Sequence, residues 1–214
     1  MFENCTSLIE TPKLQSTELA EGCYMGMFQS CESLLTSTEL PAMTLAKKCY
    51  REMFNYCKRL THAHELSATE LDVECYAGMF GACESLTQAP SILPAVTLAD
   101  GCYTSMFSYC LSLTHAPELP ATTLARDCYY YMFQDCKKLT YINVNFSSWE
   151  LQTPYISYPT YDWVYNITTQ GVFVCPNDLK TEYSSSRIPN NWQVFNKSET
   201  ENIKTKIVIP TGIK

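Results

Sequence analysis

Paired cysteines eight residues apart are the residues of this sequence whose type and spacing could do chemistry. The frame C-Y-x-x-M-F-x-x-C occurs five times, for example as CYREMFNYC at residues 49–57, and it accounts with Cys5 for eleven of the twelve cysteines. A thiol can form a disulfide, bind zinc or act as a nucleophile. The pairs therefore raise three chemical hypotheses, beside a fourth in which the thiols are buried packing groups.

The spacing argues against each chemical role. On a helix, cysteines eight residues apart are separated by roughly 12 Å along the axis, whereas a disulfide requires Cα atoms within about 7 Å. Structural zinc sites use close pairs such as C-x-x-C, and a catalytic thiol would be one distinctive cysteine beside a base. We favour a ladder of free, buried thiols, with regular disulfides and metal binding as the weaker alternatives.

The cysteine frame belongs to a longer repeat. Met-Phe pairs recur with a period of 26 residues, and one unit has 27; they begin at Met1, Met27, Met53, Met79, Met106 and Met132. A fixed period of this length indicates a repeat architecture and falls in the range of leucine-rich repeats.

Within one unit, the recurring apolar residues predict a helix. At about 100° per residue, one half of the helical wheel carries recurring residues such as Leu45, Cys49 and Met53. The other half carries variable polar residues such as Lys48 and Arg51. This pattern is typical of a helix with one face in a core and one face in solvent.

A short segment after each predicted helix, such as LTHAHEL at residues 60–66, is expected to form a strand. The fold class that we predict is therefore α/β: a right-handed leucine-rich-repeat solenoid with one short strand and one helix per repeat and a parallel sheet along one side. Residues 1–144 would form this solenoid, with about five to six repeats. Residues 145–214 are rich in aromatic residues and would form a β-rich C-terminal cap.

A family resemblance follows from the frame C-x-x-L-T-x-A-P-x-L-P-A-x-T-L-A-x-x-C-Y-x-x-M-F, best seen at residues 83–107 and 110–133. It resembles the BspA-like leucine-rich repeats of surface proteins from host-associated anaerobic bacteria, over roughly residues 1–144. The segments at 163–174 and 188–194 are similar to those that close such arrays. The resemblance implies an extracellular or cell-surface protein that adheres to a protein or glycan ligand on a host or a neighbouring microbe, without catalytic residues.

Composition excludes other classes of function. The net charge is −7 and no Lys/Arg cluster is present, so we expect no nucleic-acid partner. No apolar run approaches the ~18 residues that span a membrane, and no signal peptide is visible in this chain. We expect no enzyme, no cofactor and no metal site.

Candidate ligand-binding residues come from the predicted strands. In each unit, the second and fourth residues after the strand leucine are expected to face outward, by analogy with leucine-rich-repeat strands. A metal site of the three histidines is disfavoured, since strand spacing would place the third roughly 10 Å away. The predicted ligand-binding residues are Glu10, Thr36, Thr38, His62, His64, Gln88, His115, Tyr141 and Asn143.

We expect a non-enzymatic surface protein that presents a concave repeat face to a ligand. The alternative is a structural spacer or stalk of a larger surface protein. The function rests on architecture and resemblance, and neither feature identifies the ligand.

Overall fold

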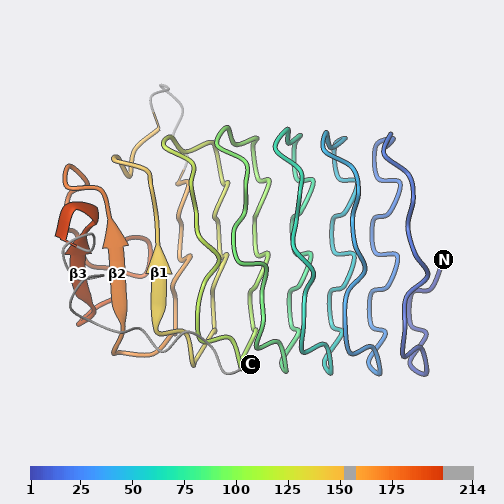
Figure 1. Cartoon of the computed structure of the whole chain (residues 1–214). Helices are drawn as coiled ribbons and strands as arrows, with labels where there is room; N and C mark the ends of the chain where they lie inside the picture. The colour runs from blue at the N-terminus through green and yellow to red at the C-terminus, as the bar shows by residue number, and fades with distance from the viewer. Residues whose placement is uncertain (152–157, 200–214) are drawn as a thin grey trace.

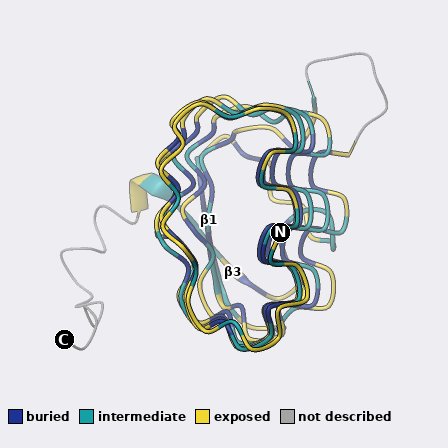
Figure 2. Cartoon of the chain, turned by 90° about the vertical axis from the view of Figure 1, so that its right-hand side faces the viewer, coloured by how far each residue is buried: buried dark blue, intermediate teal, exposed yellow. Residues whose placement is uncertain are grey.

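The chain forms a stack of coils in the computed structural model, which describes residues 1–151 and 158–199. Successive coils lie side by side, from the N-terminal coil at one end to the strands β1, β2 and β3 at the other (Figure 1). Viewed along the stack, the coils nearly superimpose in one outline (Figure 2). Equivalent positions of neighbouring repeats therefore lie next to each other.

One side of the stack is held by parallel strand pairing. Strands β1 (Tyr141–Asn143), β2 (Val172–Cys175) and β3 (Gln193–Asn196) form a parallel sheet in the order β1-β2-β3. Ile142 lies opposite Phe173, which in turn lies opposite Val194. Earlier coils continue this side through single parallel bridges. We call the surface over one set of these bridging residues the bridge face; the set is Thr36, His62, Gln88, His115 and Tyr141.

Another side of each coil contains the cysteine frame and forms a ladder of turns. Glu52 N–H donates to Ala77 O in the next coil at 2.8 Å. The next amide N–H, that of Met53, donates within its own coil to Tyr50 O at 3.3 Å. Amides along residues 50–57 alternate between these two patterns. We call this segment and its equivalents in the other coils the turn ladder.

The turn ladder requires a positive φ at every fourth residue. Lys48, Glu52 and Tyr56 have φ values of 57°, 55° and 60°. Two positions in the preceding coil hold glycine, Gly22 with φ 63° and Gly26 with φ 60°. Glycine adopts this conformation without the steric cost that other residues incur. The ladder is therefore built on a four-residue period of backbone conformation.

The predicted α/β leucine-rich-repeat solenoid, with one helix per repeat, is wrong. Among the described residues, the helical ones are 197–199, which lie outside the repeats. A residue with positive φ does not fit a right-handed helix, and three such residues interrupt each full ladder segment. The apolar pairs recur every four residues, which is close enough to the helical period of 3.6 to imitate an amphipathic helix.

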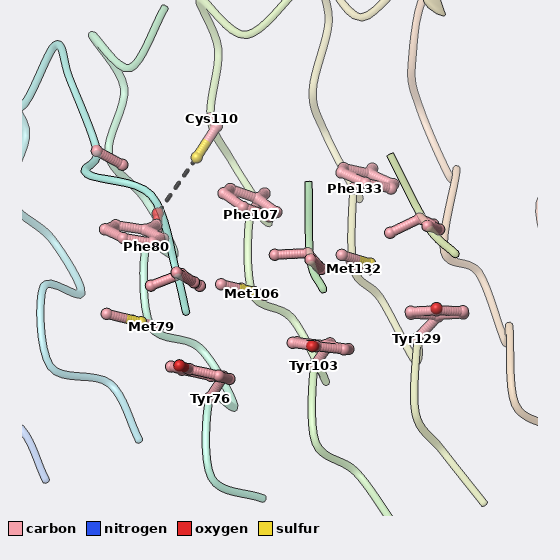
Figure 3. Packing of buried hydrophobic residues seen from close by; sticks show 14 of the residues in the cluster. Tyr76, Met79, Phe80, Tyr103, Met106, Phe107, Cys110, Tyr129, Met132 and Phe133 are labelled. Carbon is pink, nitrogen blue, oxygen red and sulfur yellow. Dashed lines mark hydrogen bonds between the residues drawn. The ribbon is translucent and has the colours of Figure 1, made fainter. Parts of the chain in front are cut away.

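The core consists of columns of identical side chains, one from each coil (Figure 3). Successive phenylalanine rings stack with centroids 5.4 to 5.9 Å apart, and tyrosine rings with centroids 5.7 to 6.1 Å apart. Each ring is covered by the rings of its neighbouring coils, so one coil cannot bury its apolar residues alone. The phenylalanine column is Phe2, Phe28, Phe54, Phe80, Phe107 and Phe133.

The ladder bonding continues beyond residue 145, into the predicted cap. Tyr129 N–H donates to Pro159 O and Phe133 N–H donates to Trp163 O, both at 2.8 Å. Trp149 and Trp163 are buried at 3% and 0% exposure, where their rings cover the last columns. Strands β2 and β3 belong to the same part of the chain. Residues 152–157 and 200–214 of the predicted cap lie outside the described residues.

Candidate ligand-binding face

Most of the predicted ligand-binding residues lie on or beside the bridge face. Thr36 bridges to His62, which bridges to Gln88, and His115 bridges to Tyr141. Parallel pairing without a shift in register brings these side chains into one row, since residues opposite each other in neighbouring strands point to the same face. Glu10, Thr36, Gln88 and His115 are exposed, His62, His64, Tyr141 and Asn143 are half-buried, and Thr38 is buried.

Hydrogen bonds fix the side chains around the two neighbouring histidines. His62 Nδ1 lies 2.7 Å from Gln88 Oε1, so the ring nitrogen is the donor to this amide oxygen. His64 N–H donates to Ser37 Oγ at 2.8 Å. The rings of His62 and His64 meet edge to face with centroids 5.4 Å apart. The His62 ring is therefore held by Gln88, and the His64 ring by its contact with His62 and by Ser37 Oγ, which lies 3.4 Å from His64 Nδ1.

Two predicted residues do not join this row. Thr38 has an exposed fraction of 7%, and its Oγ1 donates to Pro12 O at 3.4 Å, so it supports the coil from within. Glu10 is exposed in the first coil, and no bridge between described residues joins it to the row. The part of the row that can form a shared surface therefore runs from Thr36 to Asn143.

A groove of about 410 Å³ is hollowed into the C-terminal part of this row. It contains Gln88, His115, Tyr141 and Asn143 of the predicted set. Two of its residues are aromatic, His115 and Tyr141, and their ring centroids lie 5.7 Å apart with the planes at 37°. Sequence reasoning missed other groove residues: Thr87, which lies within the predicted strand segment, and Ser91 and Glu118, each of which directly follows the proline expected to end a strand.

Asn143 is a polar residue of the groove whose side-chain amide is only partly hydrogen-bonded. Asn143 Nδ2 donates to Glu118 Oε1 at 3.4 Å, which orients the amide. Asn143 Oδ1 then remains buried without a hydrogen-bond partner. Buried polar atoms are nearly always paired, so this acceptor is an exception that calls for an explanation.

Glu118 influences the ionisation of two nearby groups, Tyr141 and Lys197. Burial raises the pKa of Tyr141, and the nearby Glu118 carboxylate adds to the shift, so the phenol keeps its proton. Burial lowers the pKa of Lys197, and Glu118 opposes this shift. Lys197 also donates to Asn145 Oδ1 at 2.9 Å.

The cysteines occupy the core and not the bridge face. All twelve are free, and ten of them are buried. Cys57 Sγ donates to Phe28 O of the preceding coil at 3.1 Å, and Cys83 Sγ donates to Phe54 O at 3.2 Å. Burial raises the pKa of Cys57 to about 12. A thiol with such a pKa is protonated at neutral pH and is a poor nucleophile or metal ligand.

Comparisons with known proteins leave the chain without an assigned relative. No protein family, no characterised protein and no solved structure matches it significantly. Within residues 1–151 and 158–199, no helix is long and apolar enough to cross a membrane. The same residues contain no group of three or more His, Cys, Asp or Glu side chains that could hold a metal ion.

Proposed function

We propose that this chain is a non-enzymatic binding protein of the cell surface or the secreted fraction, and that its bridge face contacts a protein or glycan ligand. One observation carries the proposal: polar and aromatic side chains from successive coils form a row that leads into the groove at His115 and Tyr141. Their types differ from coil to coil, as expected of a surface that recognises a specific ligand.

The resemblance to BspA-like surface repeats supports the location and the adhesive role. It rests on the repeat frame at residues 83–107 and 110–133. The burial of ten thiols is compatible with an oxidising exterior, because buried and protonated thiols react slowly with oxidants. The absence of a catalytic role is part of the proposal.

Binding to an array of matrix proteins, mucins and glycans tests the function. The variant that carries His62→Ala, His64→Ala and His115→Ala should lose at least about tenfold in affinity for any ligand found. Tyr56→Ala with Tyr109→Ala is the matched control, since both tyrosines are exposed and lie on the turn ladder. Loss of binding in the control and not in the histidine variant would overturn the assignment of the face.

The second candidate is a spacer that holds another domain away from a surface. Continuous backbone bonding from coil to coil favours it, because such a stack resists bending. Absence of binding to every member of the array would favour this function over adhesion.

A further inference from the structure

We propose that the N-terminal face of the stack is a docking surface for one segment of the same repeat, supplied by a separate polypeptide. This face belongs to the first coil, residues 6–31, at the end of the stack opposite β3 (Figure 1). The inference is independent of the proposed function, because no residue of the bridge face takes part. Its basis is a set of backbone acceptors and core side chains that are covered in the inner coils and open in the first.

Three backbone carbonyl groups of the first coil have no donor. In the second coil, three alternate carbonyl oxygens each accept an amide N–H of the preceding coil at 2.9 Å, namely those of Lys47, Cys49 and Arg51. The equivalent residues one period earlier are Glu21, Cys23 and Met25, and all three are exposed. In the part of the chain that the structure describes, no hydrogen bond reaches their carbonyl oxygens. An open row of backbone acceptors is a template for pairing with another chain.

Core side chains of the first coil are open on the same face. Cys23 is exposed and Tyr24 is half-buried, whereas the equivalent Cys49 and Tyr50 have an exposed fraction of 0%. Tyr50 is stacked between the rings of Tyr24 and Tyr76, but among the described residues Tyr24 has a ring on one side only. The leucines of the first coil are half-buried, while their equivalents in the second coil are at most 4% exposed; they are Leu8, Leu14 and Leu19. The face therefore has the imprint of one coil.

The occupant that fits is a repeat segment that ends beside Met1. The chain already fills the adjoining ladder position, where Phe2 N–H donates to Met27 O at 3.0 Å. A segment with the sequence of residues 9–26, placed one period ahead of the chain, brings three amide N–H groups to the open carbonyls and its tyrosine ring onto Tyr24. In this mode of recognition, backbone hydrogen bonds supply affinity and side-chain positions supply specificity.

A second intact copy of the chain does not fit this face. The alternate ladder N–H groups of each coil donate to the following coil, so two N-terminal faces would oppose acceptors to acceptors. The other end of the stack is closed, because Val164 N–H donates to Ser185 O at 3.1 Å and Asp162 N–H donates to Ser186 Oγ at 2.9 Å. All five copies of the frame C-Y-x-x-M-F-x-x-C already lie in the stack. The segment therefore comes from a separate polypeptide that carries this repeat with unpaired amide groups.

The probe is a synthetic peptide with the sequence of residues 9–26 and the change Cys23→Ser, added to the intact chain. Bound peptide should cover the Cys23 thiol of the chain. At a free peptide concentration about tenfold above Kd, we expect thiol labelling of Cys23 to slow by about tenfold. Cys5 is the internal control: its equivalent Cys31 bonds to Phe2 O, and the matching partner of Cys5 lies outside the peptide, so its labelling should not change.

The matched control peptide carries N-methylglycine in place of Gly22 and Gly26. This change removes two of the three donors and keeps every side chain, so the control should not protect Cys23. Equal protection by both peptides would refute pairing with the open carbonyls.

A fused segment tests the fit of the face without the cost of association. With residues 9–26 and Cys23→Ser joined ahead of Met1, we expect protection of the original Cys23 and an increase in Tm of about 2–4 °C. The same fusion with Tyr24→Asp in the added copy should give neither. Protection by the fused segment alone would refute a separate polypeptide as the occupant, and absence of protection by both would refute the docking surface. The proposed function is unaffected by each of these results, since it is tested by ligand binding at the bridge face.

Discussion

Replacing Ala82 by glycine gives opposite results in a turn ladder and in a helix. Ala82 has a φ of 54° and is half-buried, so its substitution removes little besides the Cβ atom. Glycine removes the steric strain of the left-handed conformation, which should raise the free energy of unfolding by roughly 1–2 kcal/mol. Glycine also has a higher conformational entropy in the unfolded chain, which should lower the free energy of unfolding by roughly 0.5–1 kcal/mol. We therefore expect Ala82→Gly to raise the free energy of unfolding by about 0.5–1 kcal/mol. In a helix the same change would lower it by about 1 kcal/mol.

Thermal unfolding followed by calorimetry measures this difference. For a domain of this size, the expected increase in Tm is about 1–4 °C. Ala77→Gly is the matched control, because Ala77 lies in the same ladder without a positive φ and should lose about 1 kcal/mol. Gly78→Ala should also be destabilising, since Gly78 has a φ of 62° and an added Cβ would lie 3.1 Å from Glu52 Cγ. A decrease in Tm for both alanine-to-glycine variants would refute the ladder.

Three further predictions concern the core. In the native protein, a thiol reagent should label the exposed Cys5 and Cys23, and the ten buried thiols should react only after unfolding without a reductant; rapid native labelling of more than two would contradict the burial. Tyr103→Phe removes a buried hydroxyl that has no hydrogen-bond partner, so the free energy of unfolding should stay equal or rise by up to about 1 kcal/mol in a denaturant titration, and a clear loss would show that the hydroxyl has a partner. Burial raises the pKa of Cys57 from 9.0 to about 12, so the folded state keeps a proton that the unfolded state loses. This contribution to stability is present below pH 9.0 and is lost as the pH rises towards about 12. Cys57→Ala should reduce the slope of stability against pH in that range by about 1.4 kcal/mol per pH unit, and an unchanged slope would contradict the shift.

The sequence reveals the period and the core residues but not the backbone that holds them. In a helix the side-chain direction rotates by about 100° per residue, whereas a four-residue period corresponds to about 90° per residue. Over the eight residues from Cys49 to Cys57, the two side-chain directions therefore differ by only ~80°. Both arrangements therefore bury the same half of the residues. Gly22 and Gly26 were the available signal, because glycine is unfavourable in a helix and favourable at positive φ.

The candidate site is predictable only in part. The 26-residue period is enough to align His62 with Gln88, since equivalent residues of adjacent coils lie next to each other. Ser91 and Glu118 were missed because each directly follows a proline that was expected to end the strand, whereas Glu118 forms a parallel bridge with Ile92. The unpaired state of Asn143 Oδ1 depends on the orientation of a single amide, which no sequence pattern encodes.

Far-UV circular dichroism of the intact chain tests the central claim most directly, namely that the repeats are stacked turns and bridges and contain no helices. We predict a spectrum of strand and turn structure without the paired minima of an α-helix. A spectrum that requires helix in roughly a third of the residues, the usual share in globular proteins, would contradict the account.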